Sequence, residues 1–311
     1  MLNLLIAIKW RIDSLLLPLV SRHRGLYQQI HRAYWSSFRS VPNLIRPKSF
    51  NDKMQWLKLF DQTEECVRCI DKYEVRSYVS QRVGDKCLTN LYQLAASFEE
   101  IDFGLLPVSF VVKATHDSGS VLLVNDVSEV DKIEQSKRFR RALADQYGEV
   151  NAEWGYMFVH PRIMVEEYLE PHSPNPPADY KFHCCDGKIA FLQYISGRHT
   201  DPSEVVVFPD GQIADYCLFP ELRRAEEFSP PDNYAELQRV AEALSKGHKY
   251  VRVDLYSVEG QVYFGELTFW PYGGFYQGVG QACLGSEINF DLSETKTPLH
   301  SDTISKHSSA G

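Results

Sequence analysis

Two acidic residues in the last quarter of the chain, Asp254 and Glu266, are spaced so that they can meet. The stretch 250–274 alternates apolar and polar side chains on both sides of a short turn, which predicts a β-hairpin. Because successive side chains point to opposite faces of a strand, Arg252 and Asp254 share one face, and Glu266 and Thr268 share a face of the second strand. Two carboxylates with a threonine oxygen suit Mg²⁺, which commonly binds together with nucleotide phosphates. A surface hairpin with solvated acids would show the same residues, so the rest of the chain has to decide.

A small polar loop in the middle of the chain follows a lysine. A strand is predicted for 107–113, ending at Lys113, and a second short strand for 121–124. The loop between them, 114–120, is polar and contains a glycine, so its backbone N–H groups can turn inward on an anion while the lysine adds a positive charge. An ordinary hairpin would look similar. The chain contains no Walker motif and no dinucleotide-binding glycine pattern.

A proline-rich link divides the second half of the chain. The predicted strand 162–169 runs into the link at 171–177, and its exposed backbone groups could pair with an adenine base. Beyond the link, Asp-Gly turns predict antiparallel hairpins at 179–195 and 204–216. A helix is predicted at 232–247, with one buried apolar face.

The first twenty residues are hydrophobic, but three charged residues interrupt them, and there is no cleavage site for a signal peptidase. We therefore expect neither a membrane span nor a signal peptide. Apolar residues recur at helical spacing and predict an amphipathic helix that packs on the protein's own core. A peripheral contact with a membrane or a partner is the alternative. The residues of this stripe are Leu5, Ile8, Ile12, Leu15 and Leu19.

Three further helices are predicted at 49–60, 71–84 and 129–148. Nothing in their sequences points to chemistry, and we interpret them as scaffold. The polar tail from residue 293 is expected to be disordered.

The composition is that of an ordinary globular protein of 311 residues, with 44% hydrophobic and 24% charged residues. The formal net charge of -8 argues against a broad nucleic-acid-binding surface. Seven cysteines are present, an odd number, and none belongs to a complete metal-binding pattern. We expect reduced thiols in a cytosolic protein, with zinc or redox use of Cys66 and Cys69 as the minority interpretation.

Six segments taken in order are more specific than any one of them. Together they resemble the ATP-grasp superfamily and, more closely, the TupA-like ATP-grasp family, over residues 45 to 292. The segments are FNDKMQWLKLFD, DKYEVRSYV, FVVKATHDSGS, VEEYLE, DYKFHCCDGK and RVDLYSVEGQVYFGELTFWPYGG.

The resemblance implies an α+β, ATP-grasp fold in which ATP lies between two α+β lobes, with an N-terminal helical extension. The expected division is an extension at 1–45, a helical subdomain at 46–105, a lobe with Lys113 and the glycine loop at 106–170, a lobe with the metal-binding hairpin at 171–292, and the tail at 293–311.

The resemblance also assigns roles in ATP binding. Lys113 would hold the α- and β-phosphates, Asp179 would bind the ribose hydroxyls, and Lys181 would contact a phosphate. The loop would close over the γ-phosphate, and the end of the following strand would be the hinge that pairs with adenine. The loop residues are Thr115, His116, Ser118, Gly119 and Ser120, and the hinge residues are Glu166, Glu167, Tyr168 and Leu169.

On the hairpin, Asp254 and Glu266 would bind Mg²⁺, with Glu266 bridging two ions, and Arg252 would lie beside the reacting carboxylate. Thr268 stands where many ATP-grasp enzymes have asparagine, so we expect the second metal ion to be held less firmly.

The implied activity is that of an ATP-dependent carboxylate–amine ligase that forms an acyl phosphate. The family suggests an amino acid or amine joined to a uronic acid, free or as part of a glycan, of a surface polysaccharide. The alternatives are a glycosyltransferase, disfavoured because the chain has no Asp-x-Asp motif, and a catalytically silent scaffold. Substrate contacts are expected from Arg198, His199, Tyr272 and Tyr276.

Overall fold

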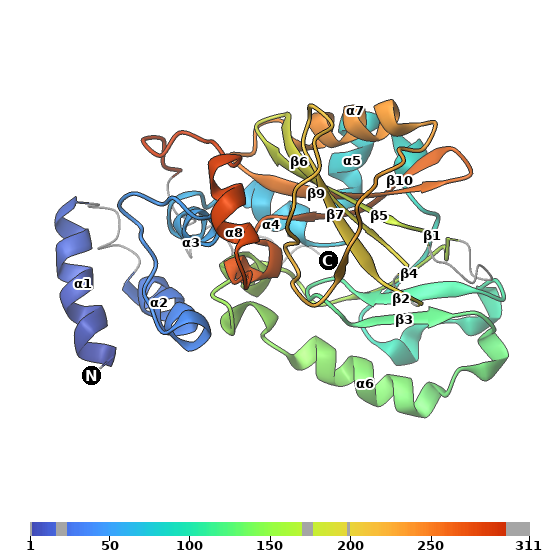
Figure 1. The fold of residues 1–311 in the computed structure, drawn as a ribbon. Coiled ribbons are helices and arrows are strands. Elements are labelled where there is room, and N and C mark those ends of the chain that lie inside the picture. Colours follow the sequence, from blue (N-terminus) through green and yellow to red (C-terminus); the bar gives the residue numbers. More distant parts are fainter. Residues whose placement is uncertain (1, 17–23, 170–176, 198–199, 297–311) are drawn as a thin grey trace.

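Two β-sheets with helices on their outer faces form the body of the protein (Figure 1). The computed structural model describes residues 2–16, 24–169, 177–197 and 200–296. Within these ranges, no helix is long and apolar enough to cross a membrane.

The smaller sheet is antiparallel and has the strand order β1-β4-β2-β3. Its strands are β1 (Leu91–Ala95), β2 (Phe110–Ala114), β3 (Val121–Val124) and β4 (Ile163–Glu166). Strand β1 was not predicted and lies in the range that we expected to be helical. The helix α6 (Lys132–Ala144), shorter than predicted, begins after the Asp131 cap and buries Phe139 in the core of this sheet.

The larger sheet has the order β10-β9-β5-β6-β7-β8, antiparallel except for the last pair. Its strands are β5 (Asp179–Cys185), β6 (Lys188–Ser196), β7 (Ser203–Val207), β8 (Arg223–Arg224), β9 (Val251–Val258) and β10 (Gln261–Thr268). The hairpin predicted at 204–216 forms only around its turn, where the Phe208 N–H donates to the Gln212 carbonyl at 2.8 Å and Val207 bridges Ile213; the other end of β7 pairs with β8 instead.

The predicted helix after the second proline pair is confirmed as α7 (Tyr234–Ser245), which covers the larger sheet. Its four apolar residues predicted to be buried have no exposed surface: Leu237, Val240, Ala241 and Leu244. The Tyr78 hydroxyl of α5 (Val75–Val83) donates 2.8 Å to the Leu244 carbonyl and ties the two helices together.

Two more helices, α3 (Phe50–Phe60) and α4 (Glu64–Ile70), precede α5. The helix predicted at 49–60 is confirmed as α3, and Ser49 caps it, because its hydroxyl accepts from the Asp52 N–H at 3.1 Å. The chain end was expected to be disordered from residue 293. Residues 297–311 lie outside the described ranges, whereas the Lys296 N–H donates to the Phe60 carbonyl at 3.0 Å.

The N-terminal extension is formed by α1 (Leu2–Leu16) and α2 (Arg24–Phe38), at one end of the molecule (Figure 1). The helix in residues 1–20 is therefore confirmed, but its packing is not. The stripe that we expected to face the core points outward, since Leu5, Ile8, Ile12 and Leu15 are 43–83% exposed; Leu19 lies outside the described residues.

Candidate active site

A bulge in the hairpin of β9 and β10 places the two predicted carboxylates opposite each other. The pairing skips Gly265, so that Glu266 pairs with Asp254 and Thr268 with Arg252. Continued without the bulge, the pairing from the turn would set Glu266 opposite Val253, on the buried face. The alternation predicted within each strand is confirmed, but the alternation alone does not bring the two carboxylates together.

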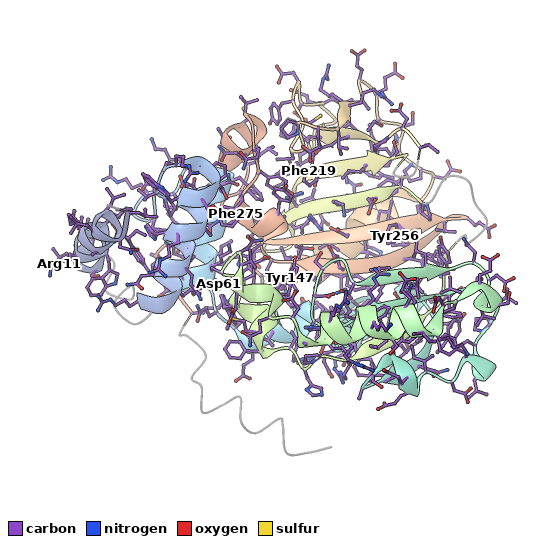
Figure 2. All side chains as sticks on the ribbon, turned by 90° about the horizontal axis from the view of Figure 1, so that it is seen from below. Arg11, Asp61, Tyr147, Phe219, Tyr256 and Phe275 are labelled. Atoms are coloured by element: carbon purple, nitrogen blue, oxygen red, sulfur yellow. The ribbon has the colours of Figure 1, made fainter. Side chains whose placement is uncertain are left out.

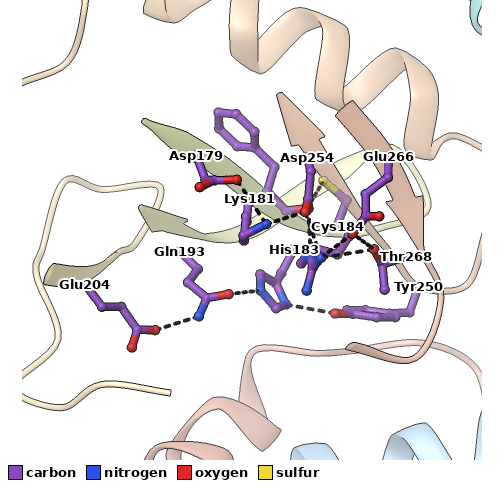
Figure 3. A network of polar contacts seen from close by, with 12 residues as sticks. Asp179, Lys181, His183, Cys184, Gln193, Glu204, Tyr250, Asp254, Glu266 and Thr268 are labelled. Carbon is purple, nitrogen blue, oxygen red and sulfur yellow. Dashed lines mark hydrogen bonds and ion pairs between the residues drawn. The ribbon is translucent and has the colours of Figure 1, made fainter. Parts of the chain in front are cut away.

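Asp254 is buried between two cations (Figure 3). Its carboxylate accepts from Arg252 Nε and Nη2 at 2.6 and 2.7 Å and from Lys181 Nζ at 2.5 Å. Lys181 also pairs with Asp179 at 3.3 Å. Burial would raise the pKa of Asp254, but Arg252 and Lys181 outweigh it and hold that pKa well below its usual range. The Asp254 carboxylate is therefore ionised at neutral pH.

Glu266 and Thr268 complete this cluster on its open side. Arg252 Nη2 donates to Glu266 Oε1 at 2.9 Å and to Thr268 Oγ1 at 3.0 Å, and the threonine hydroxyl donates to Glu266 Oε1 at 2.9 Å. The Glu266 side chain is 40% exposed, in contrast to Asp254. It is the more accessible of the two carboxylates.

The donor set fits a magnesium ion that keeps other ligands. Asp254, Glu266 and Thr268 supply only oxygen atoms, which Mg²⁺ prefers. No group of three or more His, Cys, Asp or Glu side chains within the described ranges could hold a metal ion by itself. The hairpin therefore suits an ion whose remaining ligands are phosphates and water.

A second row of hydrogen-bonded side chains runs beside the cluster, and its groups bond to one another (Figure 3). His183 Nδ1 contacts the Tyr250 hydroxyl at 2.8 Å, and Gln193 Nε2 donates to Glu204 at 2.7 Å. Burial lowers the pKa of His183 well below its usual value, so the imidazole is neutral. All four groups are buried or bonded to one another, and this row supports the sheet.

The smaller sheet contributes a lysine held by a buried carboxylate. Lys113 on β2 forms an ion pair with Glu166 at the end of β4. Arg76 lies 3.6 Å from the same carboxylate, and the Thr89 hydroxyl donates to it at 2.6 Å. Burial opposes the ionised form of Glu166, but the cations, Lys113 first, lower its pKa below the usual value.

Two small adjoining recesses lie beside β10, and the second of them reaches the strands of the smaller sheet. The first is lined in part by Glu266 and Tyr156, and the second by Lys113 and Glu166. Both are lined by Lys72 and by the bulged residue of β10. The carboxylate of one sheet and the lysine of the other therefore face neighbouring parts of one cleft.

Lys72 is a residue that the sequence reasoning missed. It lies in the turn between α4 and α5, and its Nζ donates to the Asp117 carbonyl of the glycine loop. Burial lowers its pKa, while Glu266 and Asp117 act in the opposite direction. We interpreted this region as scaffold because nothing in the local sequence indicates that the turn faces a cleft.

The glycine loop has an anchored base and an exposed tip. The Thr115 hydroxyl donates to the His160 carbonyl at 3.3 Å, and His116 Nε2 contacts the Ala142 carbonyl at 3.0 Å. Both side chains are buried. The tip, 118–120, is the part that is accessible to a ligand, and Gly119 has the positive φ of 112° that favours glycine there.

The predicted hinge follows β4. The Glu167 carboxylate accepts from Asn90 at 2.9 and 3.0 Å, and its N–H donates to the Asn90 carbonyl at 2.9 Å, while Tyr168 and Leu169 are partly exposed. Asp179 is buried at the start of β5. Residues 171–176 of the predicted link and two expected substrate contacts, Arg198 and His199, lie outside the described residues.

A left-handed turn after β10 carries the other expected contacts. Tyr272, Gly273 and Gly274 have φ values of 53°, 62° and 69°, and Tyr272 is 56% exposed. Fully buried Lys58, whose pKa burial lowers to about 7, donates to the Gly273 carbonyl at 2.7 Å and holds this turn. Tyr276 is buried and stacks on Tyr272 at 5.6 Å between ring centroids.

A family model described as TupA-like ATPgrasp matches residues 52–288. No curated protein matches the chain. D-Alanine–D-alanine ligase from Bacillus anthracis, complexed with ATP, is 18% identical with a TM-score of 0.40, covering 65% of this chain and 55% of its own. The ATP-grasp ligase PsnB, complexed with a variant of its minimal precursor, Mg and ADP, is 10% identical with a TM-score of 0.41, covering 73% and 60%. The chain thus spans less than two thirds of these ligases.

Proposed function

We propose, because the chain belongs to the TupA-like ATP-grasp family, that it is an ATP-dependent carboxylate–amine ligase. The observation that supports the proposal is that Lys113 and Glu266, from different sheets, line two neighbouring recesses, and that Lys72 lines both. The carboxylates on one side suit a metal ion, and the lysines on the other suit phosphates.

In this proposal, contacts with the nucleotide replace ion pairs that the protein makes within itself. Lys113 would bind the α- and β-phosphates in place of Glu166. The exposed loop tip at 118–120 would close over the γ-phosphate. Lys72, which lines both recesses, would also contact the phosphates. The adenine would pair with the backbone of 166–169.

The larger sheet would hold the ribose and the metal ion. Asp179 would bind the ribose hydroxyls, and Lys181, two residues on, a phosphate. Asp254 and Glu266 would bind Mg²⁺, with Thr268 as a weaker oxygen ligand. When bound, Mg²⁺ would neutralise charge on the transferring phosphoryl group.

The chemistry follows from the poor reactivity of a carboxylate. A carboxylate oxygen of one substrate would attack the γ-phosphorus of ATP, breaking its bond to the bridging oxygen and releasing ADP. An amine nitrogen would then attack the carbonyl carbon of the acyl phosphate, releasing inorganic phosphate and a proton to solvent as the amide forms. Arg252 would orient the carboxylate, and Lys113 would stabilise the charge that builds up on phosphoryl oxygens.

The substrates are proposed from the family. One would be a uronic acid, free, nucleotide-linked or in a lipid-linked glycan, and the other an amino acid or simple amine, so that the product decorates a surface polysaccharide. Tyr272 and Tyr276 beside the hairpin would contact the substrate. A cytoplasmic location is supported by all seven cysteines being free, since the cytosol keeps thiols reduced.

A substrate matrix tests the ligase proposal. The protein would be incubated with ATP and Mg²⁺ and each pair from a set of uronic acids and amino acids, while ADP is measured. We expect ADP release that requires both an acid and an amine, with an amide product detected by mass. ADP release that requires neither, or transfer of a sugar from a nucleotide sugar, would contradict it and favour the glycosyltransferase alternative.

A further inference from the structure

Helix α1 turns its larger apolar face away from the rest of the protein. At about 100° of rotation per residue, its exposed apolar side chains fall within an arc about 120° wide. A face of this kind is typical of helices that lie in a membrane interface. The arc consists of Leu4, Leu5, Ile8, Ile12, Leu15 and Leu16.

A buried polar contact fixes this orientation. Asp13, on the opposite side of α1, has no exposed surface and accepts from the Tyr27 hydroxyl of α2 at 2.8 Å. Lys9 pairs with the same carboxylate at 3.0 Å, and Ile6 is buried beside it. Rotating α1 to bury the arc would carry Asp13 away from α2 and leave the buried Tyr27 hydroxyl without its partner, at a cost in stability. The apolar arc is therefore held outward.

The N-terminal segment that contains α1 is basic, whereas the rest of the chain is acidic. Residues 1–48 contain eight lysines and arginines and one aspartate, a net charge of +7. The remaining 263 residues contain 25 basic and 40 acidic residues, a net charge of -15. On α1 itself, Arg11 borders the apolar arc on one side and Lys9 on the other. Figure 2 shows Arg11 at the far edge of the molecule.

We propose that the outer face of α1 docks on an anionic lipid surface. The apolar arc enters the boundary between headgroups and acyl chains, the basic extension faces the anionic headgroups, and the acidic body stays in water. A second copy is a poor occupant, because two segments of charge +7 repel each other. The segment 297–311 is also a poor one, with only Leu299 and Ile304 as large apolar residues.

This inference stands apart from the ligase proposal, because it rests on α1 and α2 and not on the cleft. It also gives the enzyme a place near lipid-linked substrates if the ligase proposal holds. Its test therefore uses a measurement in which no nucleotide takes part.

Vesicle flotation of the full-length protein tests the docking. Vesicles of phosphatidylglycerol and phosphatidylcholine in equal parts are compared with vesicles of phosphatidylcholine alone, and flotation excludes aggregated protein. We expect the protein to float with the anionic vesicles and at least tenfold less with the neutral ones. The double variant Ile8→Ser, Ile12→Ser should lose at least tenfold in binding, and Arg11→Gln about fivefold.

Matched controls lie on α6, far from α1. Ile133→Ser removes an exposed isoleucine, and Arg141→Gln an exposed arginine, and neither should change flotation. Circular dichroism and the unfolding temperature check that every variant is folded. The proposal is overturned if the wild type does not float with anionic vesicles, or if the isoleucine variant floats as well as the wild type. It is also overturned if light scattering shows a dimer that these substitutions dissociate.

Discussion

The two sheets meet at one cleft but arrange their charges differently. At the smaller sheet, two basic side chains, Lys113 of β2 and Arg76 of α5, surround a single buried carboxylate, Glu166. On the larger sheet, Arg252 and Lys181 are matched by carboxylates, of which Glu266 is the most open to the cleft. The group around Glu166 has one more cation than carboxylates, which suits binding to phosphates. The group around Asp254 has an accessible carboxylate, which suits binding to a metal ion.

The difference indicates how the protein stays stable before a nucleotide binds. Each group is neutralised from within, by the Lys113–Glu166 pair on one side and the Arg252–Asp254 pair on the other. A nucleotide and its metal ion would take over part of these contacts. Substitutions on the two sheets should therefore fail in different ways.

The largest effect is expected at Glu266. Glu266→Gln keeps the size of the side chain but removes the accessible carboxylate, so ADP formation should fall on the order of 100- to 1000-fold. The unfolding temperature should stay near that of the wild type, since this side chain is 40% exposed. Glu259→Gln, at the exposed turn of the same hairpin, is the matched control. Unchanged turnover in Glu266→Gln would refute the metal assignment.

Lys113 should affect both binding and stability. Lys113→Met removes a phosphate contact and leaves Glu166 buried with only Arg76 and Thr89, so we expect weaker ATP binding and a loss of about 1–3 kcal/mol in the free energy of unfolding. Adding Glu166→Gln should restore stability but not ATP binding, as measured by urea unfolding and calorimetry. If the double variant binds ATP as the wild type does, Lys113 is only structural.

Low pH should reduce the stability that Asp254 and Glu166 contribute, because both carboxylates become protonated. The pKa values of Asp254 and Glu166 are lowered in the folded state, so each carboxylate stabilises the fold above its unfolded pKa of about 4. That contribution is lost as the pH falls through the folded pKa. The part of the free energy of unfolding due to these two groups should stay flat between pH 7 and pH 5 and drop by about 1–3 kcal/mol below pH 4. Urea unfolding measures it, and a free energy of unfolding that does not fall below pH 4 would show that the two pKa values are not lowered by folding.

The bulge at Gly265 should give the smallest effect. A Cβ atom there would lie 3.0 Å from the Tyr256 ring and 3.1 Å from the Asp254 carbonyl, so the neighbours must give way slightly. We expect Gly265→Ala to lower ADP formation about tenfold by shifting Glu266 relative to Asp254. Gly25→Ala, where no atom lies within 4 Å, is the control. A fully active Gly265→Ala enzyme would show that the bulge tolerates a side chain.

Much of the fold was readable from the sequence because local patterns determine it. The hairpins with Asp-Gly and Glu-Gly turns and the helix α7 follow from turn chemistry and periodicity. The strand β1 was missed, and the arm at 212–216 was predicted too long, since it pairs with β7 only around Ile213. The strand β1 pairs with β4, far along the chain, and β8 pairs with the start of β7, so neither pairing is visible in the local sequence.

Site residues could be predicted where a sequence motif identifies them. They could not be predicted where only the packing of the folded chain brings them to the site. Lys113, Asp254 and Glu266 stand in segments whose residue types point to chemistry. Lys72 belongs to the segment DKYEVRSYV, which we interpreted as part of a scaffold helix, and only the folded structure places it beside both recesses. The outward face of α1 was mispredicted for a similar reason. Its outer face carries more apolar residues than its inner face, so the pattern favours burial of the outer face. The contact between Asp13 and Tyr27 sets the observed orientation instead.

Thermal unfolding with nucleotides tests the central claim most directly. The protein is heated alone, with ATP and Mg²⁺, with ATP and a chelator, and with a UDP-sugar and Mg²⁺. A nucleotide bound between the two sheets predicts a higher unfolding temperature with ATP and Mg²⁺, a smaller rise without the metal ion and none with the UDP-sugar. Stabilisation by the UDP-sugar and not by ATP with Mg²⁺ would contradict the assignment of the cleft.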